Sequence, residues 1–356
     1  MVFLVEIKSF SHAYEVSLGS NIEEMITSFD DDCFFLIDKS IAKNKYDFLK
    51  KIAENKIVYF EAIEQNKSLT SIDVLANEFL RLKIRKNSNL VCIGGGIIHD
   101  VGGFLASVLF RQISWTFIPT TFPAQIDTCV GGKNGVNLEH GKNMIGRIYP
   151  PKKVYIDINF LNTLTNEDLY SGIGEYIKHV LIDYSNTGKI AVEDLSLLFE
   201  KETKTLMKCV EFSLNLKKKF VEQDEFDQNE RQLLNFGHCI GHAFESASDY
   251  KIKHGVAVLI GLLAANRISF NRSYLKKDIV EVFENQLIVP VLKKLDMTII
   301  SRIKKEKIIE YIKLDKKRVK NQLTIIAFNK DCCLEKLENI ENSEVESALD
   351  YVYRIL

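Results

Sequence analysis

Residues 91–100 read VCIGGGIIHD, an apolar run that passes through three glycines into a helical pattern. A strand that turns through glycines into a helix lets backbone N–H groups and the helix N-terminus approach a pyrophosphate. The dinucleotide fingerprint GxGxxG would place glycine where His99 stands, and that third glycine normally allows the helix to pack closely on the strand. The segment indicates a nucleotide-binding turn; the alternative is a tight turn without a ligand.

Short apolar runs alternate with helical patterns around this turn, up to about residue 160. Strands are predicted over 33–37, 56–60, 90–93, 115–118 and 154–156, and a helix over 72–82. Such alternation predicts a parallel sheet. Beyond residue 160 the pattern is mostly helical, over 166–182, 194–222, 228–247, 256–268 and 276–294, with a β-like return at 322–328. We therefore expect an α/β nucleotide-binding domain with a parallel sheet (residues 1–160) and a mostly α-helical domain (residues 161–356).

Composition limits the possible partners. The 356 residues, 46% of them hydrophobic, suffice for two domain cores. A net charge of −1 argues against a dedicated nucleic-acid surface, and the longest apolar run, 256–265, is too short to span a bilayer. The seven cysteines form no CxxC pair, and the N-terminus has no targeting features. We expect a cytoplasmic protein with reduced thiols, without nucleic-acid or membrane partners.

Histidines gather in one segment, where residues 234–242 read LNFGHCIGH and His254-Gly255 follows. Neutral imidazole is the commonest protein ligand for transition metals. A spacing of four puts His238 and His242 on one face of a helix, and a third imidazole from the next element could complete a metal's shell. Hydrogen-bonded core histidines are the alternative.

Three polar segments follow the glycine turn: PTTFPAQID (119–127), GGKNGVN (131–137) and GKNMIG (141–146). Their glycine-framed lysines and short hydroxyl or amide side chains are typical of loops that hold phosphate or polyol oxygens. Upstream, Arg111 is either an anion clamp or a surface arginine.

An acid and a base lie three residues apart in SGIGEYIKH (171–179). Glu175 and Lys178 would by default form an exposed helical ion pair. The apolar neighbours of Glu175 favour a buried carboxylate, which needs a cation or a metal. Further along, Arg231 is expected to share a helix face with Asn235 and His238.

In this order the motifs GGG…D, PTT…AQ.D..VGGK.GVN, GKNMIG, G..E.IK and LNFGH..GHA.E resemble the 3-dehydroquinate synthase family of sugar-phosphate cyclases. The resemblance runs from about residue 38 to about residue 317. It implies an NAD-dependent metalloenzyme, with Zn²⁺ or Co²⁺, that is usually homodimeric. Such an enzyme of the shikimate pathway converts a seven-carbon keto-acid sugar phosphate to 3-dehydroquinate and eliminates phosphate.

The resemblance also implies roles for individual residues. It assigns the metal to Glu175, His238 and His254, where helix spacing alone would pair His238 with His242, and it leaves His242 as a catalytic or substrate-contacting imidazole. The residues implied to face the substrate are Asp127, Lys133, Lys178, Lys217, Arg231 and Asn235, with Arg111 from the facing subunit and one of Lys316 and Lys317. The implied NAD contacts are Asp38, Glu64, Lys67, Gly95, Gly96, Asp100, Thr120, Thr121, Lys142, Asn143 and Thr163.

Three positions depart from the family pattern. His99 replaces glycine, Asn134 replaces threonine, and Val256 replaces the usual acidic residue after the His-Gly of the last metal ligand. The change at Val256 suggests that a carboxylate behind the metal ligands is missing. These departures keep open a cyclase that makes another cyclitol, a metal-dependent alcohol or glycerol-phosphate dehydrogenase, and a non-catalytic sugar-phosphate-binding protein.

Overall fold

The structure is a computed structural model that describes residues 2–44, 46–139, 141–190, 193–316 and 323–356, with the backbone alone at 314–316. Contacts between Cα atoms divide the chain into two compact units. One unit comprises Met1–Leu164 and Lys201–Phe226, and the other comprises Thr165–Glu200 and Asp227–Leu356. The predicted domain boundary at residue 160 stays a prediction.

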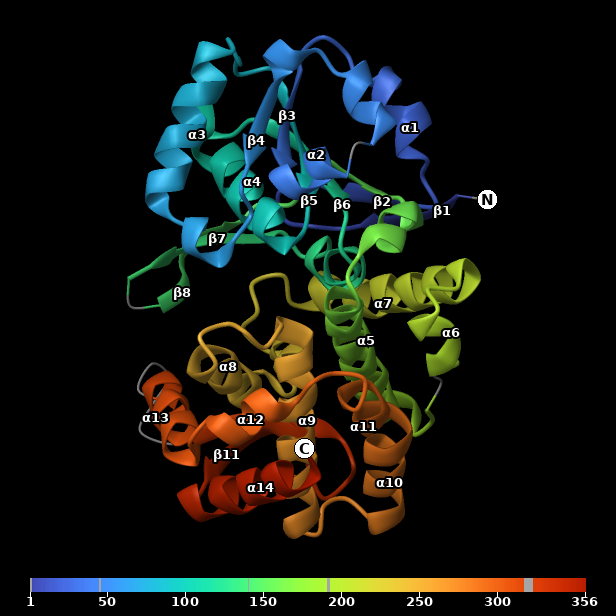
Figure 1. Cartoon of the computed structure of the whole chain (residues 1–356), viewed down its shortest axis with the longest axis vertical. Helices are drawn as coiled ribbons and strands as arrows, with labels where there is room; N and C mark the ends of the chain where they lie inside the picture. The colour runs from blue at the N-terminus through green and yellow to red at the C-terminus, as the bar shows by residue number, and fades with distance from the viewer. Residues whose placement is uncertain (1, 45, 140, 191–192, 317–322) are drawn as a thin grey trace. The chain divides into compact units, whose positions relative to one another are not determined.

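A seven-stranded sheet forms the centre of the first unit, with its strands in the order β1-β2-β9-β6-β5-β3-β4 (Figure 1). Every neighbouring pair is parallel except β1 and β2 at one edge. The strands are β1 (Phe3–Ile7), β2 (Tyr14–Leu18), β3 (Cys33–Asp38), β4 (Ile57–Phe60), β5 (Asn89–Gly94), β6 (Ser114–Pro119) and β9 (Lys153–Ile156). The predicted α/β class with a parallel sheet is confirmed.

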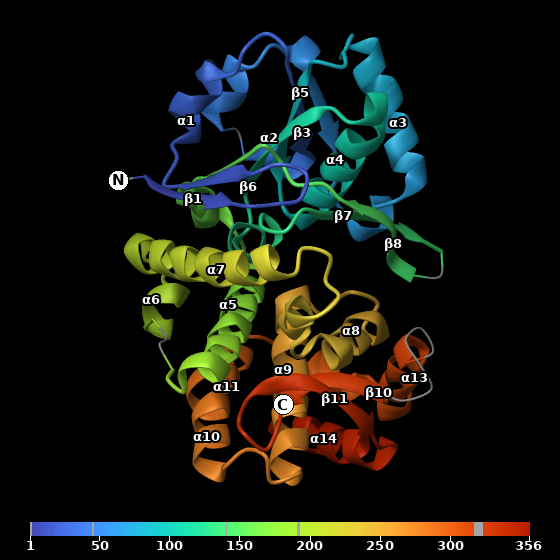
Figure 2. The same cartoon turned by 180° about the vertical axis from the view of Figure 1, so that it is seen from behind.

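Helices cover both faces of this sheet, because its inner strands are apolar on both sides. On one face, α1 (Ile22–Met25) and α2 (Lys39–Lys43) contribute to a core that contains Val91 and Ile93 of β5. The other face carries α3 (Leu69–Arg81) and α4 (Gly96–Val108), as Figures 1 and 2 show. The helix α7 (Thr203–Gln223) belongs to the same unit and contacts β1 and β2.

The glycine that lets the helix pack closely on the strand lies later in the helix than the fingerprint predicts. Helix α4 begins at Gly96, and a Cβ on Gly102 would lie 2.3 Å from Cys92 Sγ in β5. The close approach expected of a third glycine at position 99 is therefore provided by Gly102. His99 is fully buried, with its ring 5.3 Å from that of Trp115 and 4.9 Å from that of Phe117.

The prediction of loops over residues 131–146 is wrong. The strands β7 (Lys133–Leu138) and β8 (Gly141–Ile148) form an antiparallel hairpin in which Val136 pairs with Ile145. Asn134 is buried and its Nδ2 donates to the Tyr149 carbonyl at 2.7 Å. Asn134 thus connects β7 to the segment that follows β8.

The second unit is mostly helical, which confirms the prediction for this part of the chain. Its central helices are α5 (Asn166–Thr187), α8 (His238–Ala247) and α9 (His254–Asn271), and α9 is buried along most of its length. Around them lie α6 (Leu195–Phe199), α10 (Lys277–Val282), α11 (Val289–Leu292), α12 (Thr298–Arg302), α13 (Lys305–Lys316) and α14 (Asn342–Ile355). The predicted strand at 322–328 is present as β10 (Leu323–Phe328), paired with β11 (Leu334–Ile340). In the described part of the chain, no helix is long and apolar enough to cross a membrane.

Two predicted helices are interrupted. The helix predicted over 194–222 is split into α6 and α7, and the one predicted over 228–247 is broken before His238. Residues Glu230–Asn235 form a short 3-10 helix, and Gly237 adopts φ +77°. The expectation that Arg231 and Asn235 share a helix face with His238 is therefore wrong.

The helices of the second unit cross where glycines leave no room for a side chain. A Cβ on Gly174 of α5 would lie 2.2 Å from the Gly255 carbonyl oxygen, and a Cβ on Gly255 would lie 1.8 Å from that of Ser171. The neighbours of these glycines in the sequence are Glu175 and His254. The tight crossing of α5 and α9 therefore brings these two side chains together.

Gly255→Ala should destabilise the protein by about 3 kcal/mol, the upper end of the usual cost of overpacking, because two helix backbones must separate to admit the methyl group. Gly188→Ala is the control: Gly188 has φ +65° and open space around it, so only the backbone strain of about 1–2 kcal/mol applies. Urea unfolding measures both values. Equal losses of unfolding free energy in the two variants would contradict the crossing.

Candidate functional site

Four side chains from three helices of the second unit converge: Glu175 of α5, His238 and His242 of α8, and His254 of α9. Each of the three imidazoles offers a nitrogen, and these nitrogens all lie within 4.8 Å of one another. His238 and His242 lie side by side, as their spacing of four residues predicts, with ring centroids 5.2 Å apart. The arrangement has the chemistry of a transition-metal site.

The carboxylate of Glu175 faces two of these imidazoles. Its Oε1 lies 3.2 Å from Nε2 of His254 and 3.9 Å from Nε2 of His238. The carboxylate is nearly inaccessible, at 1% exposure. Glu175, His238 and His254 thus form a second possible ligand set, with one oxygen and two nitrogens, besides the set of three histidines.

The outer ring nitrogens favour the set that includes Glu175. Nδ1 of His238 lies 3.2 Å from the Phe236 carbonyl oxygen, which can only accept a hydrogen bond. Nδ1 of His254 lies 3.1 Å from Oε2 of Glu245. Both contacts place the proton of a neutral ring on Nδ1 and leave the lone pair of Nε2 on the side of Glu175. Metal-binding histidines are held in this way.

The charges around the cluster also fit a cation. Burial lowers the pKa of His238 well below its usual value of 6.5, and the Lys178 cation lowers it further, so this ring is neutral and able to bind a metal. Burial also lowers the pKa of His254, but hydrogen bonds to Glu175 and Glu245 outweigh burial and raise it to about 10. The two carboxylates therefore favour a positive charge at this point, which a divalent metal could supply in place of the proton.

Lys178 is the buried counterion of Glu175. Its Nζ lies 2.6 Å from Oε2 of Glu175, and the lysine is only 1% exposed. This pair uses one carboxylate oxygen and leaves the other, Oε1, facing the imidazoles. Arg231 is also buried, on the 3-10 helix before α8, whereas Asn235 is exposed.

In the first unit, several predicted NAD contacts gather where parallel strands end. A Cβ on Gly95, after β5, would lie 3.1 Å from Thr121, after β6, and Thr120 N donates to the Gly94 carbonyl at 3.0 Å. Asp38 ends β3 and caps α2. Ligands of open α/β sheets bind outside the carboxyl ends of the strands. The positions of Gly95, Gly96, Asp38, Thr120 and Thr121 fit this rule.

Other predicted residues of the first unit form pairs. Lys67 is buried and forms an ion pair with Asp100, whose other oxygen lies 3.3 Å from His99 Nδ1. Nζ of Lys217 lies 3.0 Å from Oδ1 of Asp127.

Asn137 connects further predicted residues of this unit. Its Nδ2 donates to Glu64 at 2.8 Å, and its Oδ1 accepts from the backbone N–H of Asn143 at 2.9 Å. Lys142 lies 3.8 Å from the same Glu64 oxygen. Thr163 instead shares a hydrogen bond with Tyr46 at 2.8 Å.

Three predicted site residues are not brought into these groups. Arg111 is exposed in a turn beyond the far end of α4, one helix length from Gly96. Lys133 is exposed at the start of β7. The side chain of Lys316 and all of Lys317 lie outside the described residues.

Two residues of these contact networks were missed by the sequence analysis. Asn137 was visible only as part of the segment 131–137, and Glu245 only as the acid at the end of GHA.E. Helical spacing offered a signal for Glu245, because an acid three residues after His242 lies on the same face.

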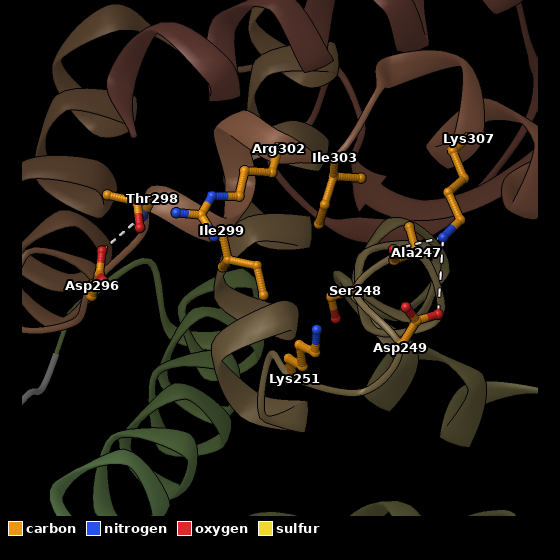
Figure 3. A pocket seen from close by; sticks show the side chains of 10 residues that line it. All are labelled: Ala247, Ser248, Asp249, Lys251, Asp296, Thr298, Ile299, Arg302, Ile303 and Lys307. Atoms are coloured by element: carbon orange, nitrogen blue, oxygen red, sulfur yellow. Dashed lines mark hydrogen bonds and ion pairs between the residues drawn. The ribbon is translucent and has the colours of Figure 1, made fainter.

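A pocket of about 480 Å³ opens beside the C-terminal end of α8 (Figure 3). Its walls carry Lys251, Arg302 and Lys307, and the Lys307 amine donates to the Ala247 carbonyl at 3.0 Å. The described residues that line it include none of the predicted site residues. The histidine cluster, and not this pocket, is therefore the candidate site.

Comparison with known proteins confirms the resemblance. Residues 57–171 match the family model for the N-terminal part of 3-dehydroquinate synthase, and residues 172–318 match the model for its C-terminal part. The chain is 34% identical over 330 residues to the 3-dehydroquinate synthase of Campylobacter jejuni strain RM1221, covering 90% of this chain and 92% of that protein. The identity to the enzyme of Pelagibacter ubique is 34% over 295 residues, 80% of each chain.

A solved structure shares the fold. The crystal structure of 2-deoxy-scyllo-inosose synthase, complexed with carbaglucose-6-phosphate, NAD⁺ and Co²⁺, matches 98% of this chain and 99% of its own with a TM-score of 0.81 and 22% identity. Because two consecutive family models match residues 57–318 and the relatives match along most of both chains, this chain belongs to the 3-dehydroquinate synthase family.

Proposed function

We propose that this protein converts 3-deoxy-D-arabino-heptulosonate 7-phosphate to 3-dehydroquinate and inorganic phosphate, with NAD and a divalent metal, Zn²⁺ or Co²⁺, as cofactors. The reaction is that of a carbon–oxygen lyase in the shikimate pathway of aromatic amino acid biosynthesis. The observation that carries the proposal is the convergence of Glu175, His238 and His254 in a chain of this family.

Glu175, His238 and His254 would hold the metal through Oε1 and the two Nε2 atoms. When bound, the metal lowers the pKa of a substrate hydroxyl, and NAD accepts a hydride that it later returns, so that no oxidant is consumed. Lys178 keeps the second oxygen of Glu175 engaged at 2.6 Å and fixes the orientation of the carboxylate. His242, half-exposed beside these residues, would move a proton to or from the substrate.

The remaining polar residues of the proposed site would contact the substrate, and the basic ones among them would bind its two acidic groups. Fixed cations in a site shielded from water stabilise anions better than water does. In the second unit the buried Lys178 and Arg231 have this character, and the exposed Asn235 is a further proposed substrate contact. In the first unit Lys133, Lys217 and Asp127 are proposed substrate contacts, with Lys316 and with Arg111 of a second subunit.

NAD would bind to the first unit at the carboxyl edge of its sheet. The backbone of Gly95 and Gly96 at the start of α4 suits a pyrophosphate. The proposed contacts are Asp38, Glu64, Lys67, Gly95, Gly96, Asp100, Thr120, Thr121, Lys142, Asn143 and Thr163. A cyclase that makes another cyclitol is the second candidate, and Val256 is the departure that favours it.

Incubation of the zinc-loaded protein and NAD with 3-deoxy-D-arabino-heptulosonate 7-phosphate should release one phosphate for each 3-dehydroquinate formed. Absorbance at the NADH wavelength should not rise, because the hydride returns to the product. Phosphate assay and identification of the product by mass spectrometry measure the outcome. Net formation of NADH would indicate a dehydrogenase, and phosphate release with a different carbocycle would indicate the second candidate.

Zinc affinity distinguishes the two possible ligand sets. Glu175→Gln and His238→Ala should each weaken zinc binding more than about 100-fold, since removal of a group behind a ligand already costs up to that much. His242→Ala should bind zinc like the wild type and yet lose activity. Titration against a fluorescent chelator gives the affinities. Loss of zinc in His242→Ala with retention in Glu175→Gln would assign the metal to the three histidines instead.

A homodimer that shares Arg111 between subunits also belongs to the proposal. Phe110, Arg111 and Gln112 all have positive φ, of 49°, 60° and 104°, and such strain is typical of functional positions. The exposed Arg111 is available to a second copy of the chain.

Mixing two inactive variants tests this sharing. Arg111→Ala and His238→Ala should each be inactive, and refolding them together in equal amounts should restore about a quarter of wild-type activity, because half the dimers contain one complete site. A mixture that stays inactive, although sedimentation shows mixed dimers, would place Arg111 outside the site of the second subunit.

A further inference from the structure

We propose that Glu245 is a positioning residue of the metal centre: its carboxylate holds Nδ1 of His254 and so presents Nε2 of this imidazole to the cation. Nothing in the sequence motifs assigned this role to Glu245. The inference rests on the proposed function, because it takes the metal to lie between Glu175, His238 and His254.

Helix α8 directs Glu245 toward the cluster. His238, His242 and Glu245 follow a spacing of four and three residues, which places them along one stripe of the helix. Glu245 is 6% exposed, and a buried carboxylate must be compensated by hydrogen bonds or positive charge. Its Oε2 lies 3.1 Å from Nδ1 of His254 and 3.9 Å from Nε2 of His242. Only the first distance is a hydrogen bond.

The imidazole of His254 is held between two carboxylates. Its Nδ1 faces Glu245 at 3.1 Å, and its Nε2 faces Oε1 of Glu175 at 3.2 Å. A carboxylate that accepts from Nδ1 fixes both the rotation of the ring and the tautomer with its lone pair on Nε2. Without Glu245, the ring could turn or carry its proton on Nε2, and either change removes the lone pair from the metal position.

His238 provides an internal comparison. Its Nδ1 is held by the backbone carbonyl of Phe236, at 3.2 Å, which no substitution at position 236 removes. For His254 the corresponding contact comes from a side chain. Of these two proposed ligands, His254 is therefore the one whose outer contact can be removed by mutation.

Glu245 also bears on the expectation drawn from position 256. The sequence suggested that a carboxylate behind the ligands is missing, because valine follows His254-Gly255. In the structure Val256 is buried in α9, and a carboxylate reaches His254 from α8 instead. The expectation that a carboxylate behind the ligands is missing is therefore wrong.

Backbone contacts separate this role from a structural one. The turn between α8 and α9 is closed by hydrogen bonds to the main-chain carbonyl of Glu245, from Ser248 Oγ at 2.8 Å and from the Tyr250 N–H at 2.9 Å. Ser248 Oγ in turn accepts from the Ile252 N–H at 3.2 Å. Because these bonds use the backbone, a change of the Glu245 side chain leaves the donors and acceptors of the turn in place.

Zinc affinity tests the proposal without substrate or NAD, by competition with a chelator. Glu245→Ala should weaken zinc binding about 10–100-fold, the usual cost of losing the group behind a metal-binding histidine. Glu245→Gln should lose less, because its amide oxygen still accepts from Nδ1 but carries no charge. Glu284→Gln is the matched control, because this glutamate of the same unit is also buried and also accepts a hydrogen bond, from Tyr351. The substitution at Glu284 should leave zinc affinity unchanged.

The visible spectrum of the Co²⁺-substituted protein gives a second readout, which a purely structural role would not change. The absorption bands of Co²⁺ should shift in Glu245→Ala and keep their wild-type positions in Glu284→Gln. Excess zinc should restore activity to Glu245→Ala, because the defect lies in affinity. If Glu245→Ala does not fold, Glu245→Gln and Glu245→Asp decide the question by the same measurements.

Wild-type zinc affinity and an unchanged Co²⁺ spectrum in the folded Glu245 variants would overturn the role of Glu245 alone and leave the proposed reaction intact. A wild-type protein that binds no zinc, or whose zinc affinity is unchanged in Glu175→Gln and His238→Ala, would overturn the metal centre itself. The two failures are therefore distinguishable.

Discussion

The backbones of α5 and α9 touch, and the proposed metal centre depends on this contact. A Cβ at Gly174 or Gly255 would lie within 2.2 Å of a carbonyl oxygen of the other helix. Glu175 follows the first glycine in the sequence, and His254 precedes the second. Gly237, which precedes His238, is also confined, although less tightly, since its Cβ would lie 2.9 Å from the Val258 carbonyl oxygen. Each proposed ligand thus stands beside a glycine at a helix crossing, so the packing that stabilises the unit also sets the distances between the ligands.

The charges of the site follow from burial. A carboxylate that is only 1% exposed needs positive charge or hydrogen bonds beside it. Lys178 lies at one oxygen of Glu175, and the imidazoles lie at the other. Glu245 supplies a second negative charge behind His254. Two carboxylates and one lysine leave a net negative charge, which favours a proton on His254 or, in its place, a divalent cation.

Much of the fold could be predicted from the sequence, because its signals are local. Apolar runs predicted the inner strands of the sheet, and the glycine turn after β5 predicted the start of α4. The hairpin β7–β8 was not predicted, because the lysine, the glycine and the two asparagines of Lys133–Leu138 disfavour a strand. This segment is extended because it pairs with β8. The break before His238 was also missed, since it depends on a positive φ at Gly237 that helical periodicity does not reveal.

The candidate site was predictable in part, and mainly through the order of the motifs. Helical spacing identified the neighbouring imidazoles of His238 and His242, but Glu175 lies 63 residues before His238 in the sequence, and no periodicity joins them. Glu245 was overlooked because an acid at a helical spacing is usually a surface residue. Its contact with His254 arises only when α8 and α9 fold against each other.

X-ray absorption at the zinc edge of the zinc-loaded protein would show which atoms surround the metal. Two imidazole nitrogens at about 2.0–2.1 Å and a carboxylate oxygen, with the imidazole signal unchanged in His242→Ala, are expected if Glu175, His238 and His254 share the ion. A shell of three imidazoles that falls to two in His242→Ala would contradict this assignment.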